Sequence, residues 1–146
     1  MATKTKIHCV ILMALLALPG LLHATVNSVF VQSTLDYNAI LITGVDVVFI
    51  YDEALLATMP ATKSAWYGNK RNFMASAGDN IDVVSLFAPQ GFDSSMLSLP
   101  QRKTDAVKVF VFGQHDVSSR AAIDITDMEN VLVQINEFGL VVTPRN

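Results

Sequence analysis

The residues best suited to catalysis are few and poorly grouped. His115 is the one histidine beyond the first 24 residues, and Asp116, Ser118 and Ser119 follow it. These types suffice for a serine hydrolase with a serine–histidine–aspartate triad. No serine, however, lies in the strained strand-to-helix elbow that exposes such a nucleophile. We therefore expect His115 in a surface loop, and a hydrolase that uses it is the least favoured function.

The carboxylates are also a poor basis for chemistry. The segment Asp124–Glu129 lacks the central glycine and the alternating oxygens of a calcium loop, so it is expected to be a solvated turn. Asp52 and Glu53 stand where a helix N-terminus favours negative charge. With a single imidazole and no thiol after the first segment, no transition-metal site is expected. No glycine-rich phosphate loop is present. The sequence therefore predicts no cofactor and no enzymatic activity.

The first residues have the organisation of a cleavable secretory signal peptide. A positively charged start precedes the unbroken apolar run Val10–Leu18, which a Pro-Gly pair ends. The order of these regions matches a signal peptide. The run is shorter than the roughly 20 residues that cross a bilayer. We expect cleavage after Ala24, which leaves residues 25–146 as a single domain without a transmembrane segment.

Charge and cysteine content limit the partners and the compartment. Thirteen carboxylates outnumber ten lysines and arginines, and Lys4 and Lys6 belong to the leader. An acidic domain without a basic stripe does not bind nucleic acid. The only cysteine, Cys9, lies in the leader ahead of most of its apolar run. The exported domain must therefore fold without disulfides.

The remaining sequence alternates between short strands and one helical segment. Val45–Tyr51 is apolar on both faces, which predicts a central strand covered on both sides. A helical insert is expected over about residues 53–78, and residues 136–139 have the pattern of a hairpin loop. Further strands are expected at 28–34, 81–87, 96–99, 106–112, 131–135 and 140–143, with minor ones at 40–42 and 121–125. These elements predict a mainly β fold, an antiparallel β-sandwich of about seven strands with one helical insert.

Two aromatic residues in the insert require different environments. Trp66 and Tyr67 are adjacent, so both cannot face the same core from one helix. Either Trp66 is buried with Tyr67 at the rim of the core, or Tyr67 contacts a loop or a partner. Tyr67 is therefore a candidate partner-binding residue.

The order of the elements resembles the TssJ family, the outer-membrane lipoproteins of the type VI secretion membrane complex. The resemblance rests on an Asp-x-Asn turn after the first strand, the run Val45–Asp52, the helical insert, a Leu-Ser-Leu-Pro segment that ends at Pro100, and the strand Val107–Phe112. It implies a transthyretin-like β-sandwich in the periplasm. It also implies that the domain docks onto the periplasmic region of a membrane-embedded secretion-complex protein.

The family's docking surface includes the loop between its first two strands, which corresponds here to Leu35, Asp36, Tyr37 and Asn38. A large aromatic side chain such as Tyr37 has little intramolecular use on a polar turn, and tyrosine is enriched at interface hot spots. One feature departs from the family, whose N-terminal cysteine carries a lipid. Thr25 stands at that position, so any attachment to the outer membrane must come through partners.

Two functions from different classes follow from the sequence. The first is a non-enzymatic periplasmic docking subunit of a type VI-like envelope complex. The second is a soluble periplasmic module that binds a small molecule or peptide beneath the helical insert.

Overall fold

The computed structural model describes residues 23–34, 42–91 and 95–146. The predicted docking residues Leu35, Asp36, Tyr37 and Asn38 lie outside these described residues, and their role stays a prediction.

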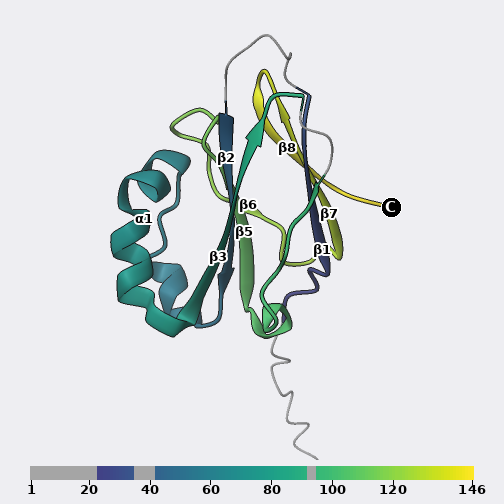
Figure 1. The fold of residues 1–146 in the computed structure, drawn as a ribbon. Coiled ribbons are helices and arrows are strands. Elements are labelled where there is room, and N and C mark those ends of the chain that lie inside the picture. Colours follow the sequence, from purple (N-terminus) through teal and green to yellow (C-terminus); the bar gives the residue numbers. More distant parts are fainter. Residues whose placement is uncertain (1–22, 35–41, 92–94) are drawn as a thin grey trace, which may run out of the picture.

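Two four-stranded sheets pack face to face, and a helix covers the outer face of one of them (Figure 1). Sheet 1 has the order β4 (Ser95–Met96), β1 (Ser28–Ser33), β7 (Asn130–Asn136) and β8 (Gly139–Pro144). Sheet 2 has the order β3 (Ile81–Pro89), β2 (Ile42–Ile50), β5 (Lys108–Gly113) and β6 (Ile123–Asp124). The predicted mainly β sandwich with a helical insert is confirmed.

Strand direction differs from the prediction at one pair. β1 and β7 run parallel, with Val29 opposite Val131 and Val31 opposite Val133, whereas all other pairs are antiparallel. Parallel neighbours cannot be joined by a hairpin and need a long crossover. Here the whole of sheet 2 and the helical insert lie between β1 and β7 in the chain and provide that crossover.

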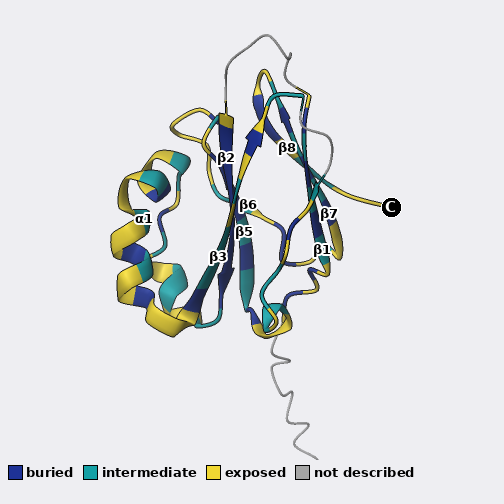
Figure 2. Ribbon diagram, viewed as in Figure 1, coloured by how far each residue is buried: buried dark blue, intermediate teal, exposed yellow. Residues whose placement is uncertain are grey.

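β2 is the central strand that the sequence predicts. It lies between β3 and β5, and its residues from Thr43 to Ile50 are all buried (Figure 2). Val47 and Phe49 belong to the core between the sheets, whereas Val48 and Ile50 pack under the helix. Both faces of β2 are apolar because one packs against sheet 1 and the other against the helix.

The helical insert consists of η1 (Glu53–Ala57) and α1 (Lys63–Ala77), followed by the short turn η2 (Gly78–Asn80). A third short helical turn, η3 (Lys103–Asp105), precedes β5. The side chain of Asp52 accepts a hydrogen bond from the Ala54 N–H at 2.9 Å and caps η1. Thr62 caps α1 in the same way, and Gly78 ends it at φ 56°. Asp52 therefore has a capping role.

Two strands and one turn are shorter than predicted. β4 and β6 contain two residues each, and the β7–β8 hairpin turn contains only Glu137 and Phe138. Gly139 closes this turn at φ 125°, a backbone conformation that glycine adopts without strain. A side chain at Gly139 would also collide with the carboxylate of Asp116.

An ion pair beside β3 predicts a weak dependence of stability on acid pH. Asp82 accepts hydrogen bonds from Arg102 Nε at 2.9 Å and from the Tyr51 hydroxyl at 2.8 Å. The Arg102 bond chiefly lowers the pKa of Asp82, so the folded pKa lies below the unfolded value of about 4. The stabilisation is present above that unfolded value and is lost as the pH falls through the folded pKa. Because both side chains are more than one third exposed, the effect is expected to stay below about 1 kcal/mol.

Urea unfolding at pH 7 and pH 3 measures this effect. Asp82→Asn should reduce the loss of stability between the two pH values, whereas Asp79→Asn, on an exposed turn, should leave it unchanged. An unchanged pH dependence in Asp82→Asn would contradict the assignment.

Candidate partner-binding surface

The side chains considered for catalysis are not arranged for it. Asp116 is buried and accepts a hydrogen bond from the Leu140 N–H at 2.8 Å, so its carboxylate is directed to β8. Within residues 23–34, 42–91 and 95–146, no hydrogen bond joins His115 to a serine or a carboxylate. The carboxylate of Asp124 accepts hydrogen bonds from Lys108 at 2.7 Å and from Thr126. Burial raises the pKa of Asp124, but these hydrogen bonds lower it by more, so its pKa lies below the usual value.

Metal and membrane features are likewise missing from the described part of the chain. None of its histidines and carboxylates come together in a group of three that could hold a metal ion. None of its helices has the length and hydropathy needed to cross a membrane.

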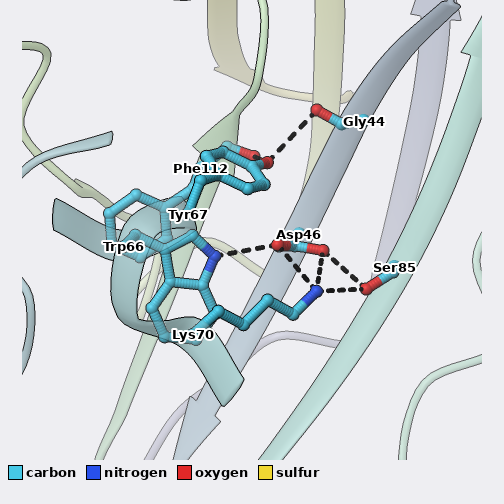
Figure 3. A network of polar contacts seen from close by, with 7 residues as sticks. All are labelled: Gly44, Asp46, Trp66, Tyr67, Lys70, Ser85 and Phe112. Carbon is cyan, nitrogen blue, oxygen red and sulfur yellow. Dashed lines mark hydrogen bonds and ion pairs between the residues drawn. The ribbon is translucent and has the colours of Figure 1, made fainter. Parts of the chain in front are cut away.

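A buried carboxylate fixes α1 on sheet 2. Asp46 lies on β2 with only 3% of its surface exposed, on the face that is turned toward the helix (Figure 3). Trp66 Nε1 donates to it at 2.8 Å and Lys70 Nζ at 2.9 Å. The Ser85 hydroxyl on β3 donates to the same carboxylate. A buried charge is stable only when it is paired and hydrogen-bonded, and these donors meet that condition.

Sequence reasoning missed this network. The signal was available: Asp46 shares its strand face with Val48 and Ile50, and a carboxylate in such a row must find a cation. Lys70 follows Trp66 by one helical turn, so both reach the same carboxylate.

Aromatic packing continues from the carboxylate into the helix interface. The Trp66 ring is stacked on Phe112 with centroids 4.9 Å apart, and Phe73 meets Trp66 edge-on at 6.2 Å. Trp66 is fully buried. It is therefore part of the core, as one of the two interpretations of this pair predicts.

Tyr67 is half-buried beside Trp66 at the rim of this core. Its hydroxyl lies 3.3 Å from both the Gly44 and Phe112 carbonyl oxygens, to which it donates (Figure 3). Burial raises the pKa of Tyr67 well above its usual range, and the nearby carboxylates of Asp46 and Asp116 raise it further. The phenol is therefore neutral and remains a donor. Its contact with a partner stays a prediction.

Gly44 lies near the start of β2, at one end of the sandwich, which we call the loop end. The loop end is formed by the last residue of β1, the first of β2, residues 87–90 at the end of β3, the β5–β6 loop and the β7–β8 hairpin turn. The chain leaves β1 at Ser33 and enters β2 at Ile42, so the predicted docking residues 35–38 connect two of its strands (Figure 1).

The loop end is unusually apolar for an exposed surface. Among the described residues, six large hydrophobic side chains are exposed, and four of them lie at this end: Ile42 at 66%, Phe87 at 67%, Val117 at 64% and Phe138 at 83%. They come from four separate elements, so no single strand period produces the cluster. Apolar side chains gathered from several elements are typical of a protein–protein contact surface.

The same end contains buried polar atoms that lack a partner. Three such atoms occur in the described residues, and all lie at the loop end: Ser33 Oγ, Gln90 Nε2 and Asp116 Oδ2. Buried polar atoms are nearly always hydrogen-bonded, because leaving one unpaired costs about 1–3 kcal/mol. The unpaired atoms, a hydroxyl oxygen, an amide nitrogen and one oxygen of the Asp116 carboxylate, mark the loop end as the least well satisfied part of the described residues.

A recess beneath the helical insert bears on the ligand-binding alternative. It has a volume of about 240 Å³ and is lined by apolar side chains that include Leu56, Met59 and Phe110. Small-molecule sites usually have volumes of about 300–1,000 Å³ and contain a few convergent polar groups. The recess is below this range and its lining provides no polar side chain. This recess therefore gives little support to a small-molecule site beneath the insert.

Comparison with known proteins finds likeness at the level of structure. No protein-family model and no curated protein sequence matches the chain. The type VI secretion lipoprotein TssJ1 of Pseudomonas aeruginosa superposes with a TM-score of 0.53 and 7% identity, over 82% of this chain and 97% of that one. Lip of Serratia marcescens, a membrane-bound component of the type VI secretion system, gives a TM-score of 0.52 and 11% identity, over 84% and 99%.

Both matches span nearly the whole of the known structures, so the similarity includes both sheets and the helical insert. At these identities the similarity concerns the fold. The chain therefore has the fold of the TssJ-type lipoproteins of type VI secretion, as the order of its elements predicts.

Proposed function

We propose that this chain is a non-enzymatic, periplasmic docking subunit of a type VI-like secretion complex. Its partner is the periplasmic region of a membrane-embedded protein of that complex. The fold supports the class of protein. The observation that carries the docking role is the cluster of exposed apolar side chains at the loop end.

The proposed contact combines residues of two origins. The predicted residues Leu35, Asp36, Tyr37 and Asn38 join β1 to β2 at the loop end. Phe138 and Val117 extend the surface on the neighbouring loops, and both are mostly exposed. A partner that covers them removes apolar area from water, at about 25 cal/mol per Å². Tyr67 contributes at the edge, with its hydroxyl held by Gly44 and Phe112.

Substitutions at the loop end test this proposal. Tyr37→Ala combined with Asn38→Ala, and separately Phe138→Asp, should reduce co-purification of the membrane partner about tenfold or more, since an interface hot spot contributes about 2 kcal/mol or more. Thermal stability should stay nearly unchanged, because Phe138 is 83% exposed and Tyr37 and Asn38 belong to a predicted polar turn. The matched control is Met96→Asp, with 63% exposure on β4, which should assemble normally.

The melting temperature separates the possible outcomes. If the double variant melts several degrees lower, Tyr37 folds back onto the sandwich, and loss of assembly reports unfolding. If it is stable and fully assembled, the docking surface lies elsewhere, most directly on α1 around Tyr67, Lys70 and Arg71.

Export and the absence of a lipid anchor are part of the proposal. We expect N-terminal sequencing of the exported protein to begin at Thr25. In the uncleaved chain the Thr25 N–H donates to the Thr126 carbonyl at 2.9 Å, and cleavage after Ala24 removes the buried Ala24 and its hydrogen bond to Ala106. Radiolabelled palmitate should not be incorporated. Labelling of the exported chain would contradict the expectation that attachment to the outer membrane comes only through partners.

A further inference from the structure

Three of the four sheet edges carry features that prevent further strand pairing. β4 and β6 contain only two residues each. On the β6 side, the Ala122 N–H donates to the Ala61 carbonyl at 3.1 Å and the Lys63 N–H to the Arg120 carbonyl at 2.7 Å, so the strip before α1 lies along this edge. Short and covered edges are the usual protection against unwanted association.

The β8 edge is protected by side chains. The Leu140 N–H donates to Asp116, and the Leu140 carbonyl accepts from Arg120 at 3.3 Å. Further along the strand, Pro144 has no N–H to donate. The outward-directed groups of β8 are therefore largely used or missing.

β3 lacks such protection except at its last residue, Pro89, which has no N–H. It is nine residues long, and within the described residues it pairs only with β2 (Figure 1). The Tyr51 N–H donates to the Asn80 carbonyl at 3.0 Å. Because alternate residues of an antiparallel strand bond to the same neighbour, this bond shows that the even-numbered residues of β3 bond to β2. Ile81, Val83, Ser85 and Phe87 then direct their backbone N–H and C=O groups away from β2. A long edge of this kind is a template for another strand.

We propose that β3 pairs antiparallel with β3 of a second copy of this chain, with Ser85 at the twofold axis. Sheet 2 and its copy then form one continuous eight-stranded sheet. Centring the pair on Ser85, the middle residue of β3, uses the whole length of the strand. It also opposes the outward-directed residues of both copies, which then exchange their backbone hydrogen bonds, except that Pro89 can only accept one from Ile81 of the second copy.

The side chains of β3 are self-complementary in this register. On the helix side, Val83 lies opposite Phe87 of the second copy, and on the sandwich side Val84 lies opposite Leu86 of the second copy. Asp82 lies opposite Ala88, so no like charges face each other. At the axis, each Lys70 contacts Ser85 at 2.9 Å but is neutralised by its own Asp46.

The helices leave room for this arrangement. α1 is centred over β2 and β5, because Trp66 contacts Asp46 on β2 and stacks on Phe112 of β5. Neighbouring strands are about 4.8 Å apart, which places the two β2 strands about 14 Å apart across the axis. The two helices lie farther apart still, beyond the roughly 8–10 Å at which helices pack.

Sedimentation equilibrium of the purified exported protein over a range of concentrations tests the proposal. A small strand-to-strand interface predicts a weak dimer, with a dissociation constant at or below about 100 µM. Val83→Lys and Phe87→Glu should each raise this constant about tenfold or more. Combined in one chain, they place the new lysine opposite the new glutamate of the second copy, which should restore dimerisation to within a few fold.

Met96→Lys is the matched control, because Met96 is 63% exposed on β4 and Phe87 is 67% exposed on β3. It should leave the dissociation constant unchanged, and thermal melting confirms that each variant is folded. A monomer at all concentrations up to about 500 µM would overturn the proposal. So would single variants that dimerise like the parent, or a folded double variant that stays monomeric. No secretion partner is present in this experiment, so its result is independent of the docking proposal.

Discussion

Asp46→Ala is expected to lower the free energy of unfolding by about 3–5 kcal/mol, the usual effect of breaking a buried ion pair by removing one partner. The substitution leaves the Lys70 ammonium and the Trp66 N–H facing a site that the carboxylate had filled. It also removes the acceptor of the Ser85 hydroxyl on β3. The measurement is urea unfolding, followed both by Trp66 fluorescence, which reports the helix interface, and by circular dichroism.

A double substitution separates the contribution of the Asp46–Lys70 ion pair to stability from that of side-chain packing. Asp46→Leu combined with Lys70→Met replaces the ion pair by apolar groups, and such replacements are often neutral or stabilising. This double variant should recover most of the stability lost in Asp46→Ala. Asp79→Ala, on the exposed turn before β3, is the control and should change stability by less than about 0.5 kcal/mol. A loss below 1 kcal/mol in Asp46→Ala would show that α1 is held by packing alone.

Phe49→Ala is expected to destabilise the protein by about 3–5 kcal/mol, the range found for truncating a buried phenylalanine. Phe49 is fully buried in the core between the two sheets and lies on the central strand β2. Neither sheet can move to fill the cavity without disturbing the ladders on both sides of β2, so relaxation is limited.

The comparison for this prediction is Phe138→Ala, which removes the same ring from a side chain that is 83% exposed. Chemical denaturation should give a change within about 0.5 kcal/mol for Phe138→Ala. Equal losses in the two variants would contradict the placement of Phe49 in the core.

Local patterns predicted most elements of the fold. The alternation in β2 shows a strand with two apolar faces, and the change of period after Asp52 marks the helical insert. The pairing of strands was less accessible. The parallel pair of β1 and β7 joins segments about 100 residues apart, and no local pattern records which strands become neighbours.

The partner-binding surface was predictable only in part. The resemblance to TssJ selects residues 35–38, and the adjacency of Trp66 and Tyr67 selects the rim of the helix. The exposure of Phe87, Val117 and Phe138 at the same end was not predicted, because their proximity depends on which loops meet there. Phe138 gave the clearest signal: an aromatic residue in a two-residue hairpin turn has no local structural role.

Site-specific photo-crosslinking in intact envelopes tests docking at the loop end most directly. A photoreactive amino acid at position 138 should form an adduct with a membrane-embedded secretion-complex protein, identified by mass spectrometry. The same amino acid at position 75, exposed near the end of α1 away from the loop end, should not. An adduct with that membrane protein from position 75 and none from position 138, in folded protein, would contradict the account.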